Sequence, residues 1–403
     1  MPSRYARLAR AELATLVPEL LLIGQLIDRS GMAWCISAWG REEMARIAIE
    51  EWAGASPVYT RRMQRALGFE GTDVVTIFKG LQLDVGAPPQ FMDFRYEVHD
   101  RWHGTFHLDH CGALMDVEPM GEDYVVSMCH DIEDPTFDAT AVATNPRAQV
   151  RPVHRPPRSP VDRHPHCAWT VTIDDAHPPV EPLPPYFTIA ATRAASLALD
   201  PIDPADEGAS DYSGPLLGDV DFAAFSHSAL VRIADEVCLQ MHLLNLSFGL
   251  AVRARAADED QAVEVLTKQL TGIAGIAAER IARALGLDDP LRVLELHPLL
   301  NPTAYADATV AGGTLKVRPS AAADDGAWIA LCGPGRLGPL QALVRAVDPH
   351  LDVEVAGTED HWTASLVRRP EPAPEAAEVA VTRFSTGSSF TFEPRRSLPI
   401  TPV

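Results

Sequence analysis

The chain has 403 residues, of which 46% are hydrophobic, and a formal net charge of −21 at pH 7. This length suits two domains with apolar cores better than one. The negative charge argues against nucleic acid and anionic membranes as main partners, since both bind through clustered Lys and Arg.

Two features indicate a cytoplasmic protein. The apolar run from Leu20 to Ile27 is too short to span a bilayer, and no signal peptide is visible. Six cysteines in so long a chain, several of them beside histidines, are typical of reduced thiols rather than of a disulfide framework.

The first part of the chain has helical periodicity. Apolar residues recur at helical spacing over residues 3–26. The charged turn after Gly40 predicts another helix, with Met44, Ala48 and Trp52 on one face, and a further helix is expected to end at Gly68.

From Met92 the pattern changes to the alternation of β-strands. We expect strands over 92–98, 102–108, 124–128, 149–154 and 169–173, with a helix over 135–145. Helices followed by an antiparallel sheet define an α+β domain over residues 1–173. A Pro-rich, acidic linker follows over 174–225.

The pattern then repeats over residues 226–370. Glu259–Gly286 matches Arg41–Gly68 without a gap, Trp328–Cys332 resembles Val125–Cys129, and Asp352–Ala356 resembles Gln149–Val153. Trp362-Thr363 resembles Trp169-Thr170 in the same way. We therefore predict two tandem related domains that form an intramolecular pseudo-dimer. Residues 371–403 are expected to form a hairpin of strands 378–384 and 389–392 and a loose tail.

Histidine and cysteine concentrate in the first copy. Nine of the fourteen histidines lie between His99 and His177, together with three of the six cysteines. Thiolate and imidazole ligands suit zinc or iron. The candidate metal ligands are Cys111, Cys129, Cys167, His130 and His166. The alternative is that these cysteines are ordinary buried packing residues.

A second reading of the same stretch is nucleophilic catalysis. Cys129 would attack, with His130 and Asp131 as the adjoining base and carboxylate, or with His154 or His166 as the base. The alternative is that the carboxylates here only cap the next helix.

A basic segment follows this candidate nucleophile. Arg151 and Arg155, beside His154, could clamp the carboxylate of a substrate. A solvated basic loop is the alternative reading.

The copies differ where the chemistry is expected. The second copy has Gly333-Pro334 after Cys332 where the first has His130-Asp131 after Cys129. Proline offers neither a base nor a metal ligand, so we expect any reaction in the first copy. The second copy could serve as a structural partner, or as the contact for a protein partner or a homo-oligomer.

Several scattered residues suggest a family. They are Trp39-Gly40 before a helix ending in Trp52, Leu67-Gly68, Phe94–Asp100, Cys111, Cys129 and His166-Cys167-Ala168-Trp169. In these the chain resembles the 2-aminothiazoline-4-carboxylate hydrolase-like proteins, which are similar in turn to the vinyl-four-reductase type of small-molecule-binding domain. The resemblance covers residues 30–173 and, faintly, 226–368. It implies a helical layer over an antiparallel sheet, a cysteine-lined pocket and ring-opening hydrolysis of a small heterocyclic acid.

Together these readings predict a small-molecule hydrolase acting on a C–N bond of a heterocyclic or amide-like acid. Water activated by zinc or iron, or attack by a cysteine, would carry the reaction. The competing prediction is a non-catalytic sensor or accessory module that binds a small molecule or a metal.

Overall fold

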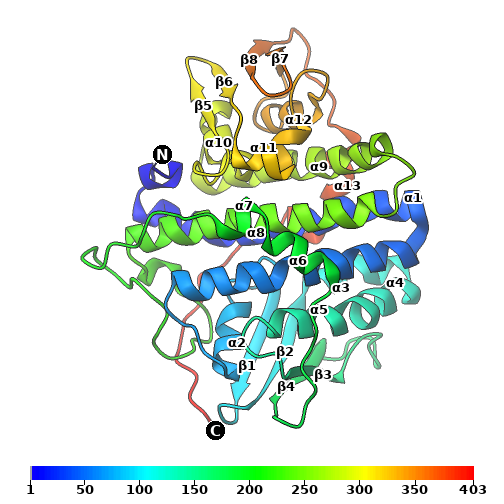
Figure 1. The fold of residues 1–403 in the computed structure, drawn as a ribbon, viewed down its shortest axis with the longest axis vertical. Helices are drawn as coiled ribbons and strands as arrows, with labels where there is room; N and C mark the ends of the chain where they lie inside the picture. Colours follow the sequence, from blue (N-terminus) through cyan, green and yellow to red (C-terminus); the bar gives the residue numbers. More distant parts are fainter. Residues whose placement is uncertain (1) are drawn as a thin grey trace.

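Each half of the chain begins with a pair of long helices. In the computed structural model, which describes residues 2–403, α1 (Arg10–Ala66) reverses at Gly40, whose φ of 83° and ψ of 172° are not helical. Glycine adopts such angles without steric cost, so the two arms of α1 lie side by side (Figure 1). In the second half, α8 (His227–Arg253) and α9 (Glu259–Leu285) form the matching hairpin.

Each half also contains one four-stranded antiparallel sheet with the same strand order. In the first half this order is β1-β2-β4-β3, and in the second it is β5-β6-β8-β7. The strands are β1 (Met92–Val98), β2 (His103–Cys111), β3 (Ala148–His154), β4 (Cys167–Ile173), β5 (Ala308–Ala311), β6 (Thr314–Val317), β7 (Leu351–Gly357) and β8 (Trp362–Arg368). The prediction of an α+β fold with two related units is confirmed.

Shorter helices connect these elements. In the first unit they are α2 (Val74–Leu81), α3 (Gly112–Val117), α4 (Glu122–Val126), the π-helix η3 (Ser127–Ile132) and α5 (Glu133–Ala141). In the second unit they are α10 (Pro290–Leu296), α11 (Ala321–Asp325), η6 (Trp328–Leu331) and α12 (Gly338–Val347). The linker carries α6 (Pro184–Ala190) and α7 (Arg193–Ser196), and α13 (Ala377–Arg383) lies near the C-terminus.

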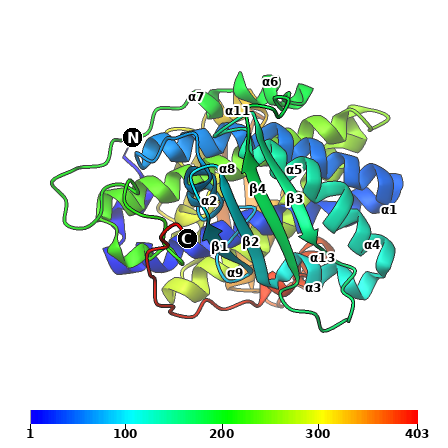
Figure 2. The ribbon, with the colours of Figure 1, turned by 90° about the horizontal axis from the view of Figure 1, so that it is seen from below.

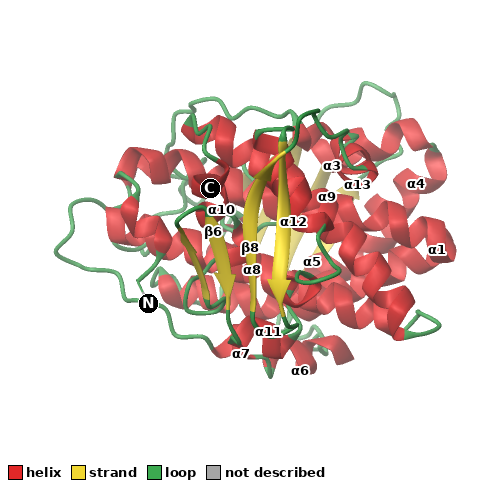
Figure 3. Cartoon of the chain, turned by 90° about the horizontal axis from the view of Figure 1, so that it is seen from above, coloured by secondary structure: helices red, strands yellow, loops and turns green. Residues whose placement is uncertain are grey.

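The helices form the middle of the molecule and the two sheets its outer layers (Figure 1). Figures 2 and 3 show the first sheet from below and the second from above, each with helices behind it. Along β2, Phe106 and Leu108 are buried toward the helices, whereas His103 is exposed. This alternation is typical of a sheet with one solvated face.

Two buried ion pairs join the units reciprocally. Arg62 of the first unit donates to both carboxylate oxygens of Glu236 in the second, at 2.8 and 3.1 Å. Arg280 of the second unit donates to Glu19 of the first at 2.7 Å. The two arginines occupy the same place in the match of residues 41–68 with 259–286. Such reciprocity is the mark of a two-fold interface, so the units form an intramolecular pseudo-dimer.

Two predicted strand regions are helical instead. Residues 124–128, predicted as a strand, belong to α4 and η3, because Val125, Cys129 and Ile132 are buried at helical spacing. The segment of the second copy that resembles it, Trp328–Cys332, is not a strand either, since Trp328–Leu331 form η6 and Cys332 follows it.

The C-terminal hairpin was also wrong. Residues 377–383 form α13, and 386–388 form a short 3₁₀ turn. The tail beyond them is hydrogen-bonded rather than loose: the amide of Ile400 donates to the carbonyl of Leu216, and that of Val403 to the carbonyl of Val98.

The match of Trp169 with Trp362 is displaced by two residues. Ala148 faces Ile173 across β3 and β4, and Leu351 faces Arg368 across β7 and β8. When β3 is aligned with β7, and β4 with β8 through these pairs, Trp362 corresponds to Cys167.

Of the helices within residues 2–403, none is long and apolar enough to cross a membrane.

Candidate functional site

A cavity of about 590 Å³ lies in the first unit, between the hairpin α1, the connections α3 to α5 and the C-terminal helix α13. Six of the chain's nine methionines line it. They are Met32, Met44, Met92, Met115, Met120 and Met128. Trp52, Phe94 and Phe137 complete its apolar wall. The volume is that of a typical ligand pocket, and methionine adapts to ligands of irregular shape.

The first arm of α1 provides a polar end to this cavity. Gln25, Asp28 and Arg29 line it from one helix face, as spacings of three and four residues require. Asp28 is 1% exposed and pairs with Arg29 through one oxygen, but its other oxygen, Oδ1, has no hydrogen-bond partner within residues 2–403. Gln25 Oε1 and Arg29 Nε are also buried and have no hydrogen-bond partner within residues 2–403. A buried polar atom without a partner costs about 1–3 kcal/mol, so these atoms mark a place where a ligand would bind.

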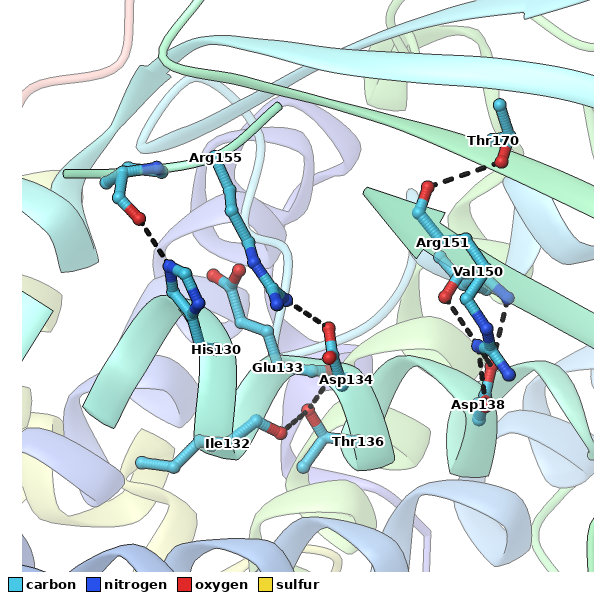
Figure 4. Close-up of polar contacts among 11 residues, drawn as sticks. His130, Ile132, Glu133, Asp134, Thr136, Asp138, Val150, Arg151, Arg155 and Thr170 are labelled. Carbon is cyan, nitrogen blue, oxygen red and sulfur yellow. Dashed lines mark hydrogen bonds and ion pairs between the residues drawn. The ribbon is translucent and has the colours of Figure 1, made fainter. Parts of the chain in front are cut away.

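Glu133 approaches the cavity from the start of α5. It follows the π-helix η3, a distortion that is frequent at functional sites. Its Oε2 is buried with no hydrogen-bond partner in the described part of the chain. Burial raises the pKa of Glu133 to about 8, and the nearby charge of Arg155 only partly opposes this. Figure 4 shows its carboxylate beside the guanidinium of Arg155, which pairs with Asp134.

Two further buried carboxyls accompany these groups. Asp84 lines the cavity and accepts from Tyr59 Oη at 2.8 Å and from the Gly86 amide at 2.7 Å. Burial still raises the pKa of Asp84 to about 6. Glu51 is fully buried, and its burial and the charge of Asp28 raise its pKa well above the usual range. Burial therefore disfavours the charged form of Asp84, which lines the cavity, and of Glu51, which does not.

The C-terminal segment closes one side of the cavity. Asp116 accepts hydrogen bonds from Ser385 Oγ at 2.6 Å, from the Thr386 amide at 2.7 Å and from Thr386 Oγ1 at 2.9 Å. Two lining residues, Met120 and Phe384, are 49% and 87% exposed. They place the mouth of the cavity between the end of α3 and α13.

The predicted metal ligands do not form a metal site. Within residues 2–403, no three side chains of His, Cys, Asp or Glu are arranged so that they could hold a metal ion. Cys111, Cys129 and Cys167 are all buried. Burial raises the pKa of Cys111 to about 12 and the pKa values of the other two well above their usual range. The charges of Glu133 and Cys111 also raise the pKa values of Cys129 and Cys167, so these groups are neighbours, and Cys111 Sγ lies 3.6 Å from Met92 Sδ.

His166 has a different environment from the one predicted. It is 4% exposed and its ring packs beside those of His110 and His164. Burial and the nearby Arg158 lower the pKa of His166 to about 4. Its Nδ1 is buried without a partner in the described chain.

The predicted catalytic group is not assembled either. His130 Nε2 donates to the Pro156 carbonyl at 2.7 Å (Figure 4). Asp131 is exposed. Burial raises the pKa of the Cys129 thiol well above its usual range, which disfavours the thiolate that a cysteine nucleophile uses.

The predicted substrate clamp is used within the protein. Arg151 donates to both carboxylate oxygens of Asp138, at 2.9 and 2.8 Å, and Arg155 pairs with Asp134 (Figure 4). His154 is partly buried, which lowers its pKa. None of the predicted site residues is among those lining the cavity, although their neighbours Met128, Ile132 and Glu133 are.

The acidic positions at the cavity differ between the two units. The reciprocal ion pairs align Glu19 with Glu236, and this register places Asn245 at the position of Asp28. The match of residues 41–68 with 259–286 places Gln269 at the position of Glu51. These two amides satisfy each other, since Asn245 Nδ2 donates to Gln269 Oε1 at 3.1 Å. Comparing the two copies was the sequence signal that could have identified Asp28 and Glu51.

Comparison of the chain with protein-family models, with curated proteins and with solved structures gives no match. The function therefore has to be argued from the cavity itself.

Proposed function

We propose that the first unit binds a small molecule with a largely apolar body in the methionine-lined cavity, and that the second unit is its structural partner. The observation that carries this proposal is a ligand-sized cavity with apolar walls and buried, unpartnered polar atoms at one end. The second unit's helices cover the first unit's helical hairpin, as the reciprocal ion pairs require. A further protein partner on the second unit stays a prediction.

A matched pair of variants tests the proposal. Ala48 lines the cavity, and Leu266 stands at its position in the second unit. Ala48→Leu should weaken binding of the neutral fluorescent probe N-phenylnaphthylamine at least about tenfold without loss of stability, because the added carbons occupy the binding space. Leu266→Ala should leave probe binding intact but lower the free energy of unfolding by about 2–5 kcal/mol. Fluorescence titration and urea unfolding measure both. Equal probe binding by Ala48→Leu and the wild type would contradict the proposal.

Hydrolysis in the same cavity is a second candidate, favoured by Glu133. A carboxyl with a pKa of about 8 is matched to proton transfer near neutral pH. In its ionised form Glu133 would take a proton from water as the water attacks the carbon of a C–N bond, and would return that proton to the nitrogen as the C–N bond breaks, which gives a carboxylic acid and an amine. This differs from the resemblance, which implies that cysteines line the pocket. A zinc or iron ion at the cysteines is not part of this proposal, because the side chains do not fit one.

Glu133→Gln separates binding from hydrolysis. It should abolish turnover of an amide-like substrate and leave binding of N-phenylnaphthylamine within about twofold, because glutamine keeps the shape but cannot accept the proton. Turnover that survives in Glu133→Gln would exclude Glu133 as the base.

A further inference from the structure

The polar end of the cavity has more acceptors than donors. Among the lining residues, the buried polar side-chain atoms without a partner in residues 2–403 are Gln25 Oε1, Asp28 Oδ1, Glu133 Oε2 and Arg29 Nε. Gln25 Oε1 and Asp28 Oδ1 are acceptors, Glu133 Oε2 becomes an acceptor when its carboxyl ionises, and Arg29 Nε is a donor. Gln25 and Asp28 are 5% and 1% exposed, so water outside the protein does not satisfy them. A ligand that suits this end must bring hydrogen-bond donors.

The charged groups that line the cavity also favour a ligand that brings hydrogen-bond donors. Its lining holds four carboxyl groups, those of Asp28, Asp84, Asp116 and Glu133, and one guanidinium, that of Arg29. Arg29 is already paired with Asp28. Although burial acts against it, the charges of Asp28 and Asp116 raise the pKa of Arg29, so this cation is well compensated. An anionic ligand would meet four carboxyls and no free cation among the lining residues.

We infer that the ligand is a hydrophobic primary amine, bound with its ammonium group toward Gln25, Asp28 and Glu133 and its apolar body against the methionines. This inference rests on the proposed function, since it names the ligand class of the same cavity. An ammonium group carries three N–H donors and no acceptor, the complement of what the lining atoms lack. The aromatic face of Trp52 adds a favourable surface for a cation.

Binding of a cation would be linked to protons. In the empty cavity Glu133 is largely neutral at neutral pH, because burial raises its pKa to about 8. An ammonium ion favours the ionised carboxylate and lowers that pKa, so the protein would release a proton when the amine binds. Affinity should therefore rise as pH increases toward about 8.

The test is calorimetric titration of the full chain with octylamine, octanol and octanoate, which share one alkyl body and differ in head group. Octylamine should bind one equivalent at least about tenfold more tightly than octanol, with octanoate weakest. Repeating the titration in buffers of different ionisation enthalpy should show proton release with octylamine alone.

Variants show which side chains cause the preference for octylamine over octanol. Glu133→Gln should reduce the amine-over-alcohol preference at least about fivefold and abolish the proton release while octanol still binds. Asp28→Asn should act similarly, but it leaves Arg29 buried without its partner, so Glu133→Gln carries the test if that variant does not fold. Glu359→Gln, on an exposed loop carboxyl, should change nothing and controls for non-specific attraction to an acidic protein.

The outcomes separate the two proposals. Equal affinity for octylamine and octanol, or tightest binding of octanoate, would overturn the amine inference and leave the cavity as a binding site. An amine preference that is undiminished in both Glu133→Gln and Asp28→Asn would also overturn it, because neither carboxyl of the cavity would then be its cause. Failure of all three probes to bind would remove the proposed function together with the inference.

Discussion

At the residue scale, the two units bury different polar side chains at matching positions. Asn245 and Gln269 place complementary amide groups together in the second unit. Asp28 and Glu51, at the matching places of the first unit, bury two carboxyls that cannot both ionise cheaply. The two carboxyls of the first unit need a proton or a counter-charge. This arrangement, present in the first unit only, is consistent with the proposed binding of a ligand in the cavity that Asp28 lines.

The same argument predicts a pH dependence of stability. The pKa of Glu133 is raised in the folded protein, so its contribution to stability is fully present below the unfolded pKa and is lost as pH rises through about 8. Glu133→Gln cannot ionise and should escape this loss. Its free energy of unfolding, relative to wild type, should therefore increase from acidic pH to about 8, by roughly 1.4 kcal/mol for each unit by which the folded pKa exceeds the unfolded one.

Urea unfolding across this pH range measures the effect. Glu359→Gln is the control, because an exposed carboxyl should give a profile parallel to that of the wild type. A parallel profile for Glu133→Gln would mean that Glu133 ionises in the folded protein as freely as in the unfolded chain.

At the scale of elements, periodicity was enough for the long helices and most strands. The alternation around Phe106 and the helical spacing around Met44 report local burial, which sequence carries directly. The strand predicted over residues 124–128 is wrong because Val125 and Val126 favour strands in isolation, whereas the buried spacing of Val125, Cys129 and Ile132 is helical.

The cavity was beyond the reach of sequence patterns. Its walls join Asp28 on α1 with Glu133 on α5 and Thr386 after α13, residues brought together only by the folded chain. The cluster of histidines and cysteines was the stronger sequence signal. In the structure the cysteines pack inside the sheet and helices, while His103 and His107 lie toward the open face. Residue type directed attention to the unit that contains this cavity but could not show which side chains face an empty space.

At the scale of the whole molecule, the two units of the chain pack against each other as the two subunits of a homodimer do. Arg62 and Arg280 also anchor connecting segments: Arg62 donates to the Ala195 carbonyl of the linker at 2.9 Å, and Arg280 to the Gly387 carbonyl beside α13 at 2.8 Å. The second interaction ties the interface to the segment that closes the cavity. Arg280 therefore connects the interface between the units with the segment that closes the cavity of the first unit.

The reciprocal pairs give the last prediction. Glu236→Gln and Glu19→Gln each leave an arginine almost fully buried without a counter-ion, so each should lower the free energy of unfolding by about 3–5 kcal/mol. Replacing both partners by apolar residues, as in Arg62→Met with Glu236→Leu, should recover part of the loss, because Arg62 is then no longer buried without its counter-ion, whereas Arg232, which also pairs with Glu236 at 3.0 Å, still loses its partner.

Urea unfolding followed by tryptophan fluorescence should show one transition in every variant, since Trp52 in the first unit and Trp328 in the second report on units that share the interface. Two separate transitions in the wild type would show that the units fold independently. A change under about 0.5 kcal/mol in Glu236→Gln would mean that the pair lies outside the interface that holds the pseudo-dimer together.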